Sequence, residues 1–406
     1  MRFDPSTVRE DFPILSRMIE GRPLAYLDNA ATTQKPAVVI DAMSRYYERS
    51  NANVHRAVHL LAGEATEAYE RARATLKAWF DAKDHRLVLT SGTTESINLV
   101  AHAWGRANLG PGDVILLSEV EHHSNIVPWQ MLADDVGCDL RYLPLNPSTG
   151  QIDLTDLDIA MEGVRLISII HTSNVLGTRS PLEDLIEAGR ANGARILIDA
   201  AQAVPHTRLS AQALGVDFIA LSAHKMVGPT GIGAVIIDPE VFEEMVPFLG
   251  GGDMIETVSL EGSTYQTNEH RFEAGTPRIA EAIGWDAAIT WLEGVDLEAA
   301  HAHIHDLAAR AHAGLSTVPG LELHSHLDPS GSGICTFTHP DLHAEDVAHL
   351  LDAQGIAVRT GHHCAMPLLE RLGVGTTIRA SFYLYNTIEE VERLIQAMHG
   401  IVTRFG

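Results

Sequence analysis

A lysine and an aspartate near the middle of the chain have the residue types and the spacing for cofactor chemistry. Lys225 ends the run Ser-Ala-His-Lys, 26 residues after Asp199, and an apolar, β-rich run precedes each segment. Alone, the aspartate could be a loop residue and the lysine a solvated surface charge. Together, an acid that keeps a pyridine nitrogen protonated and an amine that forms a Schiff base fit a pyridoxal 5'-phosphate (PLP) site. The pair therefore predicts carbanion chemistry on an amino acid.

A phosphate-binding turn is predicted where a strand meets a helix at residues 91–95, which read Ser-Gly-Thr-Thr-Glu. Small residues let backbone N–H groups approach an anion, and the helix dipole favours negative charge at that end. Thr93 or Thr94 can add a hydroxyl, and Ser222 and His224 are further candidates because they lie just before the Schiff-base lysine. The alternative is an ordinary helix cap formed by Thr93.

Two other predicted loops carry side chains that could face the same cofactor. His122 follows a strand that ends at Ser118, and it could stack on the pyridine ring and exchange protons. Asn174 follows the strand that runs into His171, and it could bond the ring hydroxyl or the substrate carboxylate. In a chain with 22 histidines, His122 could equally be a loop histidine, and Asn174 could be a turn residue.

A cysteine in a glycine-containing loop is the candidate nucleophile. Cys364 follows Arg359-Thr-Gly-His-His and precedes a predicted helix. The arginine, the two histidines and the helix N-terminus would favour the thiolate, which is the reactive form. The alternative is a structural thiol. Cys335 lies in an apolar strand pattern typical of a buried core residue, and Cys138 lies in a helix-to-strand connection that indicates no role.

The composition excludes several classes of protein. The 406 residues carry a net charge of −24, which argues against a nucleic-acid surface. No apolar run approaches the roughly 20 residues that span a bilayer, and the N-terminus lacks the pattern of a secretory signal. Three widely spaced cysteines suit a reducing compartment, so a cytoplasmic location is expected. Neither CxxC nor HExxH spacing occurs, so no metal site is predicted.

Alternating strand and helix patterns from about residue 36 to residue 240 predict an α/β fold. We expect a large PLP-binding domain with a mostly parallel sheet covered by helices, in which ligands bind beyond the carboxyl ends of the strands. The predicted strands are 86–90, 113–118, 165–170, 195–198, 217–221 and 233–237. The predicted helices are 64–80, 96–107, 125–135 and 182–191.

A smaller α+β domain is predicted to follow a long helical stretch at 279–315. We expect the large domain to span 18–290, and the small domain, which carries the cysteine loop, to combine 1–17 with 291–406. The predicted strands of the small domain are 333–338, 356–358 and 377–384, and its predicted helices are 344–354 and 388–399.

The run RTGHHCAMPL around Cys364 resembles that of the group II cysteine desulfurases, the SufS/CsdA type of the class V aminotransferase superfamily. These enzymes have the PLP fold of type I. The resemblance covers nearly the whole chain. Its other motifs are AYLDNAATTQKP (25–36), NVHRAVHLL (53–61), GTTESINLVA (92–101), EHHSNIVPWQ (121–130), SNVLGT (173–178), DAAQAVPH (199–206), SAHKMVGPTGIG (222–233), RFEAGTP (271–277) and IRASFYLYNT (378–387).

The resemblance implies a role for each matching residue. Lys225 would hold PLP, Asp199 would pair with the pyridine nitrogen, His122 would stack on the ring, and Gln202 would contact the ring hydroxyl. The phosphate contacts would be Thr94, Ser222, His224 and, reaching the other subunit of a homodimer, Thr276. The substrate contacts would be Arg379, Asn174 and Arg359, with His55 and Arg56 at the entrance.

The resemblance also implies the reaction. L-Cysteine would become L-alanine, and its sulfur would pass to Cys364 as a persulfide. A SufE- or SufU-like acceptor protein would then receive the sulfur for iron–sulfur cluster assembly. The alternatives are a selenocysteine lyase on the same fold, an aminotransferase or kynureninase-like hydrolase, and a catalytically idle paralogue that only holds a partner. The aminotransferase and the hydrolase need no thiol, so the cysteine in RTGHHC argues against both, and the presence of both lysine and cysteine disfavours the idle paralogue.

Overall fold

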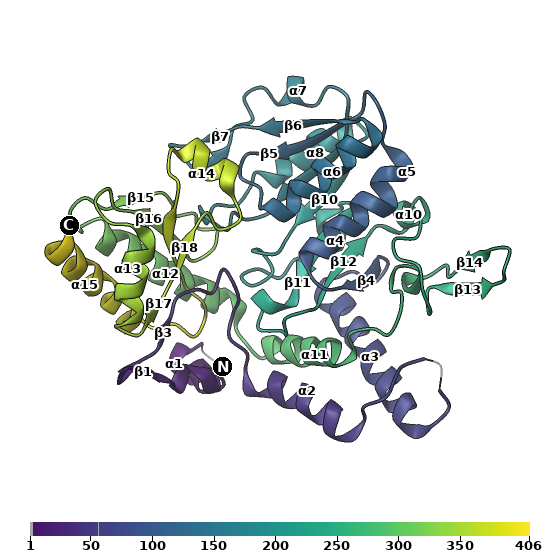
Figure 1. Ribbon diagram of the computed structural model, residues 1–406, viewed down its shortest axis with the longest axis horizontal. Coiled ribbons are helices and arrows are strands. Elements are labelled where there is room, and N and C mark those ends of the chain that lie inside the picture. The colour runs from purple at the N-terminus through teal and green to yellow at the C-terminus, as the bar shows by residue number, and fades with distance from the viewer. Residues whose placement is uncertain (1–2, 56) are drawn as a thin grey trace.

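A seven-stranded sheet forms the centre of the protein, as the computed structural model of residues 3–55 and 57–406 shows (Figure 1). Its strand order is β4-β12-β11-β10-β9-β5-β6, and β12 runs opposite to the other six strands, which are parallel to one another. The strands are β4 (Arg86–Thr90), β5 (Val114–Ser118), β6 (Asp139–Leu143), β9 (Val164–Ile170), β10 (Arg195–Asp199), β11 (Phe218–Ser222) and β12 (Gly233–Ile237). The predicted mostly parallel sheet is confirmed.

Both faces of this sheet are buried because successive strand residues point to opposite sides. In β10, Ile196 and Ile198 join one apolar cluster, whereas Leu197 between them joins another. The first cluster lies under α2 (Ala37–Arg49), α3 (Leu60–Trp79), α8 (Leu182–Ala191) and α11 (Ile279–Glu293). The second lies under α4 (Thr93–Val100), the π-helical turn η2 (Ala101–Gly105), α6 (Val127–Val136) and α10 (Pro239–Glu243).

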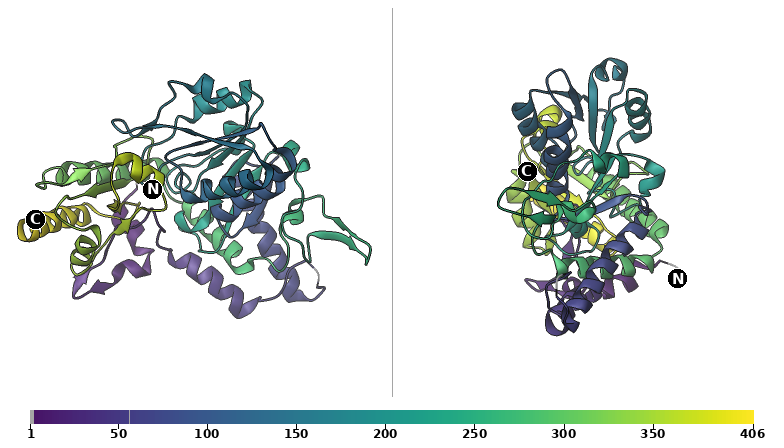
Figure 2. Two further views of the ribbon diagram at one scale, coloured as in Figure 1. Left: turned by 45° about the horizontal axis from the view of Figure 1, so that its top comes forward. Right: turned by 90° about the vertical axis from the view of Figure 1, so that its right-hand side faces the viewer.

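A smaller α+β unit lies beside the large sheet (Figure 2). Its antiparallel sheet has the order β15-β16-β19-β18, and a third apolar cluster packs it against three helices. The elements are α12 (Leu297–Leu315), β15 (Glu322–Leu323), β16 (Ile334–Thr338), α13 (Ala344–Asp352), β17 (Ile356–Ala357), β18 (Arg359–Gly361), α14 (Met366–Leu372), β19 (Thr377–Ser381) and α15 (Ile388–Phe405).

The N-terminal segment contacts the small unit. Strand β3 (Ala25–Tyr26) pairs in parallel with β17, and Arg9 forms an ion pair of 3.0 Å with Glu390 on α15. The proposed division of the chain at residues 17 and 290 stays a prediction. The remaining elements are α1 (Pro5–Glu10), η1 (Pro13–Ser16), β1 (Met18–Ile19), β2 (Arg22–Pro23), α5 (Arg106–Asn108), η3 (His123–Asn125), β7 (Leu145–Asn146), β8 (Gln151–Ile152), α7 (Leu157–Ala160), α9 (Ala211–Leu214), η4 (Ala223–Lys225), β13 (Ile255–Val258), β14 (Ser263–Tyr265) and η5 (Glu269–Phe272).

The helical stretch predicted at 279–315 has these outer bounds in the structure and consists of two helices, α11 and α12. The first, α11, ends at Glu293, and Asp296 begins the second by accepting a hydrogen bond from the backbone N–H of Ala299 at 3.1 Å. An aspartate that caps a helix satisfies a backbone donor which has no partner within the helix. The apolar periodicity on both sides of this break conceals it in the sequence.

Candidate active site

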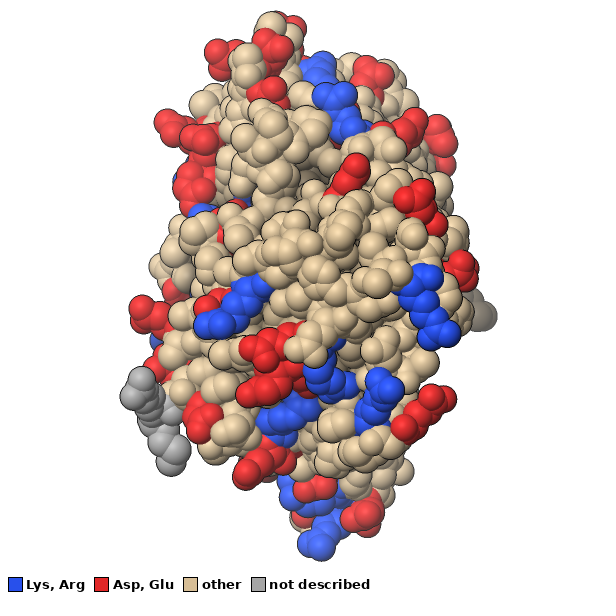
Figure 3. Space-filling model, turned by 90° about the vertical axis from the view of Figure 1, so that its left-hand side faces the viewer, with Lys and Arg blue, Asp and Glu red and all other residues tan. Residues whose placement is uncertain are grey.

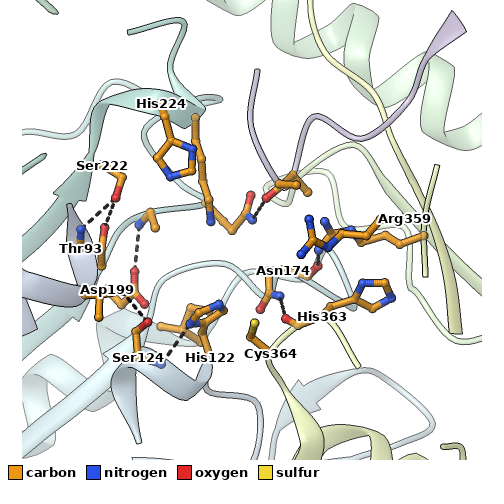
Figure 4. Close-up of a pocket in the computed structure, with 18 residues that line it drawn as sticks. Thr93, His122, Ser124, Asn174, Asp199, Ser222, His224, Arg359, His363 and Cys364 are labelled. Carbon is orange, nitrogen blue, oxygen red and sulfur yellow. Dashed lines mark hydrogen bonds between the residues drawn. The ribbon is translucent and has the colours of Figure 1, made fainter. Parts of the chain in front are cut away.

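The carboxyl ends of β4, β5, β9, β10 and β11 surround a cavity of about 190 Å³ between the large sheet and the small unit (Figure 4). In a parallel sheet these ends share one edge, so loops far apart in the sequence meet there. The side chains that line the cavity are Ala30, Ala31, Thr93, Thr94, His122, Ser124, Ile170, Asn174, Asp199, Ala201, Gln202, Ser222, His224, Lys225, Arg359, His363, Cys364 and Arg379.

Lys225 and Asp199 both line this cavity; Asp199 is 2% exposed and Lys225 is partly buried. Burial lowers the pKa of Lys225 to about 8, even though the charge of Asp199 acts in the opposite direction. Burial raises the pKa of Asp199, while the N–H of Ala201, which donates to its Oδ1 at 3.0 Å, favours the ionised form. A lysine with a lowered pKa supplies a neutral amine near physiological pH, as a nucleophile or base requires.

His122 faces the same cavity as a neutral ring. Burial and then the nearby charge of Lys225 lower the pKa of His122 to about 3. Its Nδ1 accepts a hydrogen bond from the backbone N–H of Ser124 at 3.1 Å, so the ring proton lies on Nε2. A neutral imidazole can stack on an aromatic cofactor without placing a second positive charge beside the lysine.

One end of the cavity is built from hydroxyls and a helix N-terminus. Ser222 Oγ accepts a hydrogen bond from the backbone N–H of Thr93 at 2.9 Å and lies 2.8 Å from its hydroxyl. Thr94 Oγ1 lies 2.7 Å from Ser124 Oγ. Helix α4 begins at Thr93, and Gly92 occupies the cap position, so the alternative in which Thr93 caps the helix is wrong. Donors converge here as an anion site requires.

Gly233 permits this construction because β12 passes very close to the turn before α4. A Cβ atom at Gly233 would overlap the carbonyl oxygen of Leu221 and lie 2.5 Å from the Cα of Gly92. No side chain fits between these backbones. The glycine therefore allows β12 to pass close to both β11 and the turn before α4 at the hydroxyl-rich end.

The opposite end of the cavity holds a buried arginine. Arg379 on β19 is 2% exposed, and its Nη1 donates to the carbonyl oxygen of Asn174 at 2.8 Å. Its Nη2 donates to Asp28 Oδ1 at 3.3 Å. Two further buried atoms, Arg379 Nε and Asn174 Oδ1, have no hydrogen-bond partner among the described residues. Buried polar atoms are seldom left unpaired, so this end is suited to a polar ligand.

Cys364 stands at the rim, next to this arginine end, on a loop held by hydrogen bonds from the large unit. Its side chain is exposed, and its carbonyl oxygen accepts the backbone N–H of His123 at 2.7 Å. The carbonyl oxygen of His363 accepts from Asn174 Nδ2 at 2.7 Å. Cys364 and His363 both adopt left-handed backbone angles, with φ of +57° and +50°. Non-glycine residues rarely adopt this conformation, which is a form of strain that clusters at functional sites.

Nearly all of the predicted site residues meet in this cavity. The exceptions are Thr276 and His55, which lie elsewhere on the surface, and Arg56, which lies outside the described residues. Sequence reasoning missed Asp28, Ser124 and the structural role of His363. Asp28 follows β3 in a run that reads Asp-Asn-Ala-Ala-Thr-Thr, and this polar run after a strand was the available signal.

Cys335 and Cys138 are buried, and Cys335 is fully so. Burial raises the pKa of the Cys335 thiol to about 12, which makes it a poor nucleophile at neutral pH. Cys364 is therefore the one exposed thiol among the three cysteines, as the sequence predicts.

Comparison with known proteins identifies the family. The profile of the class V aminotransferases matches residues 25–394. The chain is 46% identical to a probable cysteine desulfurase from Streptomyces coelicolor, over 99% of this chain and 98% of that protein. It is also 46% identical to a cysteine desulfurase from Escherichia coli, over 99% of both. The chain belongs to the cysteine desulfurases of the class V aminotransferase family.

Solved structures of cysteine desulfurases have the same fold. The crystal structure of CsdA from Escherichia coli superposes with a TM-score of 0.90 at 37% identity and full coverage of both chains. The apo enzyme from Thermococcus onnurineus superposes with a TM-score of 0.94 at 38% identity, over 100% of this chain and 99% of that one. The predicted family and α/β fold class are both confirmed.

This family is PLP-dependent, and the cavity of this cysteine desulfurase fits the cofactor. Lys225 would supply an amine for the aldehyde, and Asp199 would supply a buried carboxyl for the pyridine nitrogen. The hydroxyls of Thr93 and Ser222 beside the α4 N-terminus supply donors for a phosphate. The aldehyde, the pyridine nitrogen and the phosphate of PLP would therefore each have a chemically matching group, and the unpaired atoms at the arginine end remain for a substrate.

Charged side chains of both signs are found on the surface of the protein. On the face shown in Figure 3, Lys and Arg side chains are interspersed with Asp and Glu. None of the helices formed by the described residues combines the length and the apolar character needed to cross a bilayer.

Proposed function

We propose that this chain converts L-cysteine to L-alanine and retains the sulfur on Cys364 as a persulfide. One observation carries the proposal: an exposed thiol, a partly buried lysine and a buried arginine line a single cavity. An amino-acid substrate needs a group for its carboxylate, a base for its α-proton and, for desulfuration, a nucleophile for its sulfur. Arg379, Lys225 and Cys364 are of the right types for these three tasks.

The cofactor end of the cavity would be held by side chains of the large sheet. Lys225 would bind the aldehyde of PLP, Asp199 would face the pyridine nitrogen, and Gln202 would contact the ring hydroxyl. His122 would stack on the ring as a neutral imidazole. The phosphate would be held by Thr93, Thr94, Ser222 and His224. When bound, PLP draws electron density from the substrate's α-carbon and makes its proton acidic.

The substrate would be oriented by the arginine end. The unpaired Nε of Arg379 would donate to its carboxylate, as guanidinium groups commonly do to carboxylates. The second N–H of Asn174 Nδ2, which donates its first to the carbonyl oxygen of His363, would assist. Arg359, whose side chain is 46% exposed, would add positive charge at the mouth. Lys225, with a pKa of about 8, can accept the α-proton near neutral pH.

Cys364 would then take the sulfur. Its thiolate attacks the substrate sulfur, so an S–S bond forms while the bond from that sulfur to the β-carbon breaks. The β-carbon keeps the electron pair and gains the proton that the Cys364 thiol lost. L-Cysteine and a thiol thus become L-alanine and a persulfide, without any external oxidant or reductant.

The test is alanine formation from L-cysteine, with a reductant that releases the persulfide sulfur. The parent protein is compared with Cys364→Ala and with Cys138→Ala, a matched control for loss of a thiol away from the cavity. We expect Cys364→Ala to keep bound PLP and lose alanine formation, and Cys138→Ala to retain it. Comparable alanine from parent and Cys364→Ala would overturn the role of Cys364. No observation among the described residues favours selenocysteine lyase over this activity.

We also propose that the chain forms a homodimer. Thr276 is exposed beside a surface hollow of about 350 Å³, apart from the chain's own cavity, so it is available to the phosphate of a second subunit. His55 and Arg56 would line the entrance. The hairpin of β13 and β14 projects from the body and exposes Val258 and Leu260, which supports a protein contact there (Figure 1). Light scattering after size-exclusion chromatography would measure the state, and a monomer would contradict it.

The persulfide sulfur would be transferred to an acceptor protein of the SufE or SufU kind, for use in iron–sulfur cluster assembly. The exposed position of Cys364 supports access by such a protein. We also propose a cytoplasmic location, which suits an enzyme that works through a free thiol.

A further inference from the structure

Two histidines and a glutamate meet on the surface outside the catalytic cavity. His55 comes from the loop between α2 and α3, Glu70 from α3, and His270 from η5. One ligand atom from each lies within 4.8 Å of the others. Glu70 Oε1 is the shared centre: it lies 3.0 Å from His55 Nε2 and 4.0 Å from His270 Nε2.

The surroundings orient these atoms toward one another. His270 places its other nitrogen, Nδ1, 3.5 Å from Glu273 Oε2. A carboxylate behind a histidine in this way fixes the ring and is the usual second partner of a metal-binding imidazole. Arg73 Nε donates to Glu70 Oε2 at 3.1 Å, so the Oε1 atom of Glu70 is left for the two histidines.

The backbone of His55 is held in an unusual conformation. Its φ of +70° lies in the left-handed region, which a residue with a side chain rarely adopts. The hydroxyl of Thr66, one turn before Glu70 on α3, accepts the backbone N–H of His55 at 2.9 Å. A strained residue that is tied to the helix carrying the carboxylate indicates a placed side chain.

We propose that His55, Glu70 and His270 bind a transition-metal ion of the zinc class. Two imidazoles and a carboxylate are a common ligand set for zinc, and water would occupy the fourth position. Zinc bonds of about 2.0–2.1 Å require ligand atoms roughly 3.3 Å apart, so His270 must move inward by about 1 Å.

Charge and access both favour a cation. With neutral imidazoles, the carboxylates of Glu70 and Glu273 outweigh the guanidinium of Arg73 by one negative charge. The three ligand side chains are 24%, 39% and 26% exposed, so an ion can reach them from solvent. Bound metal would tie His55 to α3 and η5.

The experiment is a zinc titration of the full-length, PLP-loaded protein against a chromophoric chelator. Cys364→Ala serves as the background, because the catalytic thiol and its neighbouring histidines could bind zinc themselves. Two variants are compared in that background: His270→Gln removes a ligand, and His349→Gln removes an exposed histidine on α13. We expect one tightly bound zinc per chain, an affinity loss of at least about tenfold for His270→Gln, and no loss for His349→Gln.

Equal zinc affinity in the two variants, or no site in the background protein, would refute the proposal. A second measurement does not depend on folding of a variant. Zinc should protect His55 and His270 from acylation by diethyl pyrocarbonate, as mapped by peptide mass spectrometry, while His349 stays reactive. Unprotected labelling of His55 and His270 at saturating zinc would overturn the site.

Discussion

Replacement of Arg379 by lysine tests the proposed substrate end of the cavity. The guanidinium contacts the carbonyl oxygen of Asn174 at 2.8 Å and Asp28 at 3.3 Å, and its Nε remains for a ligand. Lysine keeps the positive charge but has no planar set of donors, so it cannot hold these partners and also bind a carboxylate in two places. The change therefore removes geometry and leaves charge in place.

The size of the effect follows from the bonds that are lost. Hydrogen bonds to charged groups contribute about 1.5–3 kcal/mol each, and one or two would be lost to the substrate carboxylate. The total of about 1.5–6 kcal/mol corresponds to a fall of roughly 10- to 10⁴-fold in kcat/KM. The carboxylate does not change during desulfuration, so most of the loss should appear as a higher KM for L-cysteine.

The assay is steady-state alanine formation over a range of L-cysteine concentrations. Arg141→Lys is the matched control, because Arg141 also donates to carbonyl oxygens, those of Ala160 and Glu162, but far from the cavity. We expect the control to match the parent, and PLP absorbance and circular dichroism to be unchanged in both variants. A kcat/KM for Arg379→Lys within threefold of the parent, or a fall in kcat at constant KM, would refute the reasoning.

Three further predictions concern the cofactor end. Burial lowers the pKa of Lys225 to about 8, so its amine is deprotonated above that pH. The rate at which PLP-free protein forms its coloured PLP adduct should therefore rise between pH 7 and 9. A flat pH profile of this rate would contradict the prediction. Gly233→Ala should lower the free energy of unfolding by about 1–3 kcal/mol, because the Cβ of the alanine would overlap the carbonyl oxygen of Leu221. Urea denaturation measures this change. An unchanged denaturation midpoint would show that the strands can separate without cost. His122→Phe should retain PLP affinity within a few-fold, because an aromatic ring can still stack on the cofactor. Alanine formation should fall by about 10²–10⁴-fold, because phenylalanine cannot transfer a proton. Full activity of the variant would exclude proton transfer by His122.

Local sequence patterns determined much of the fold. Strands β4 and β12 and helix α8 have the predicted bounds, because each is a short apolar or amphipathic segment with clear ends. Other predicted elements differ by a few residues. The predicted helix at 96–107 is realised as α4, a π-helical turn and α5, a distinction that hydrophobic periodicity does not reveal.

The candidate site was also largely determined by the sequence. Lys225 and Asp199 each follow a recognisable strand of the large sheet, and parallel strand ends must share one edge of the sheet. That argument places side chains from separate loops together without knowledge of their contacts. The Cys364 loop follows β18 of the antiparallel sheet, so its place at the cavity rests on the packing of the two units. The roles given to the individual residues stay predictions.

Only the tertiary structure decided how the two units meet. Asp28 pairs with Arg379 across 351 positions of the chain, and Asn174 holds the backbone of the cysteine loop at His363. The same holds for the cluster at Glu70, whose partners come from two other segments. A contact between distant segments depends on the packing of whole elements, and the periodicity of neither segment records its partner. Sequence patterns thus determined the helices, strands and loops of this protein, and packing determined which of these segments contact one another.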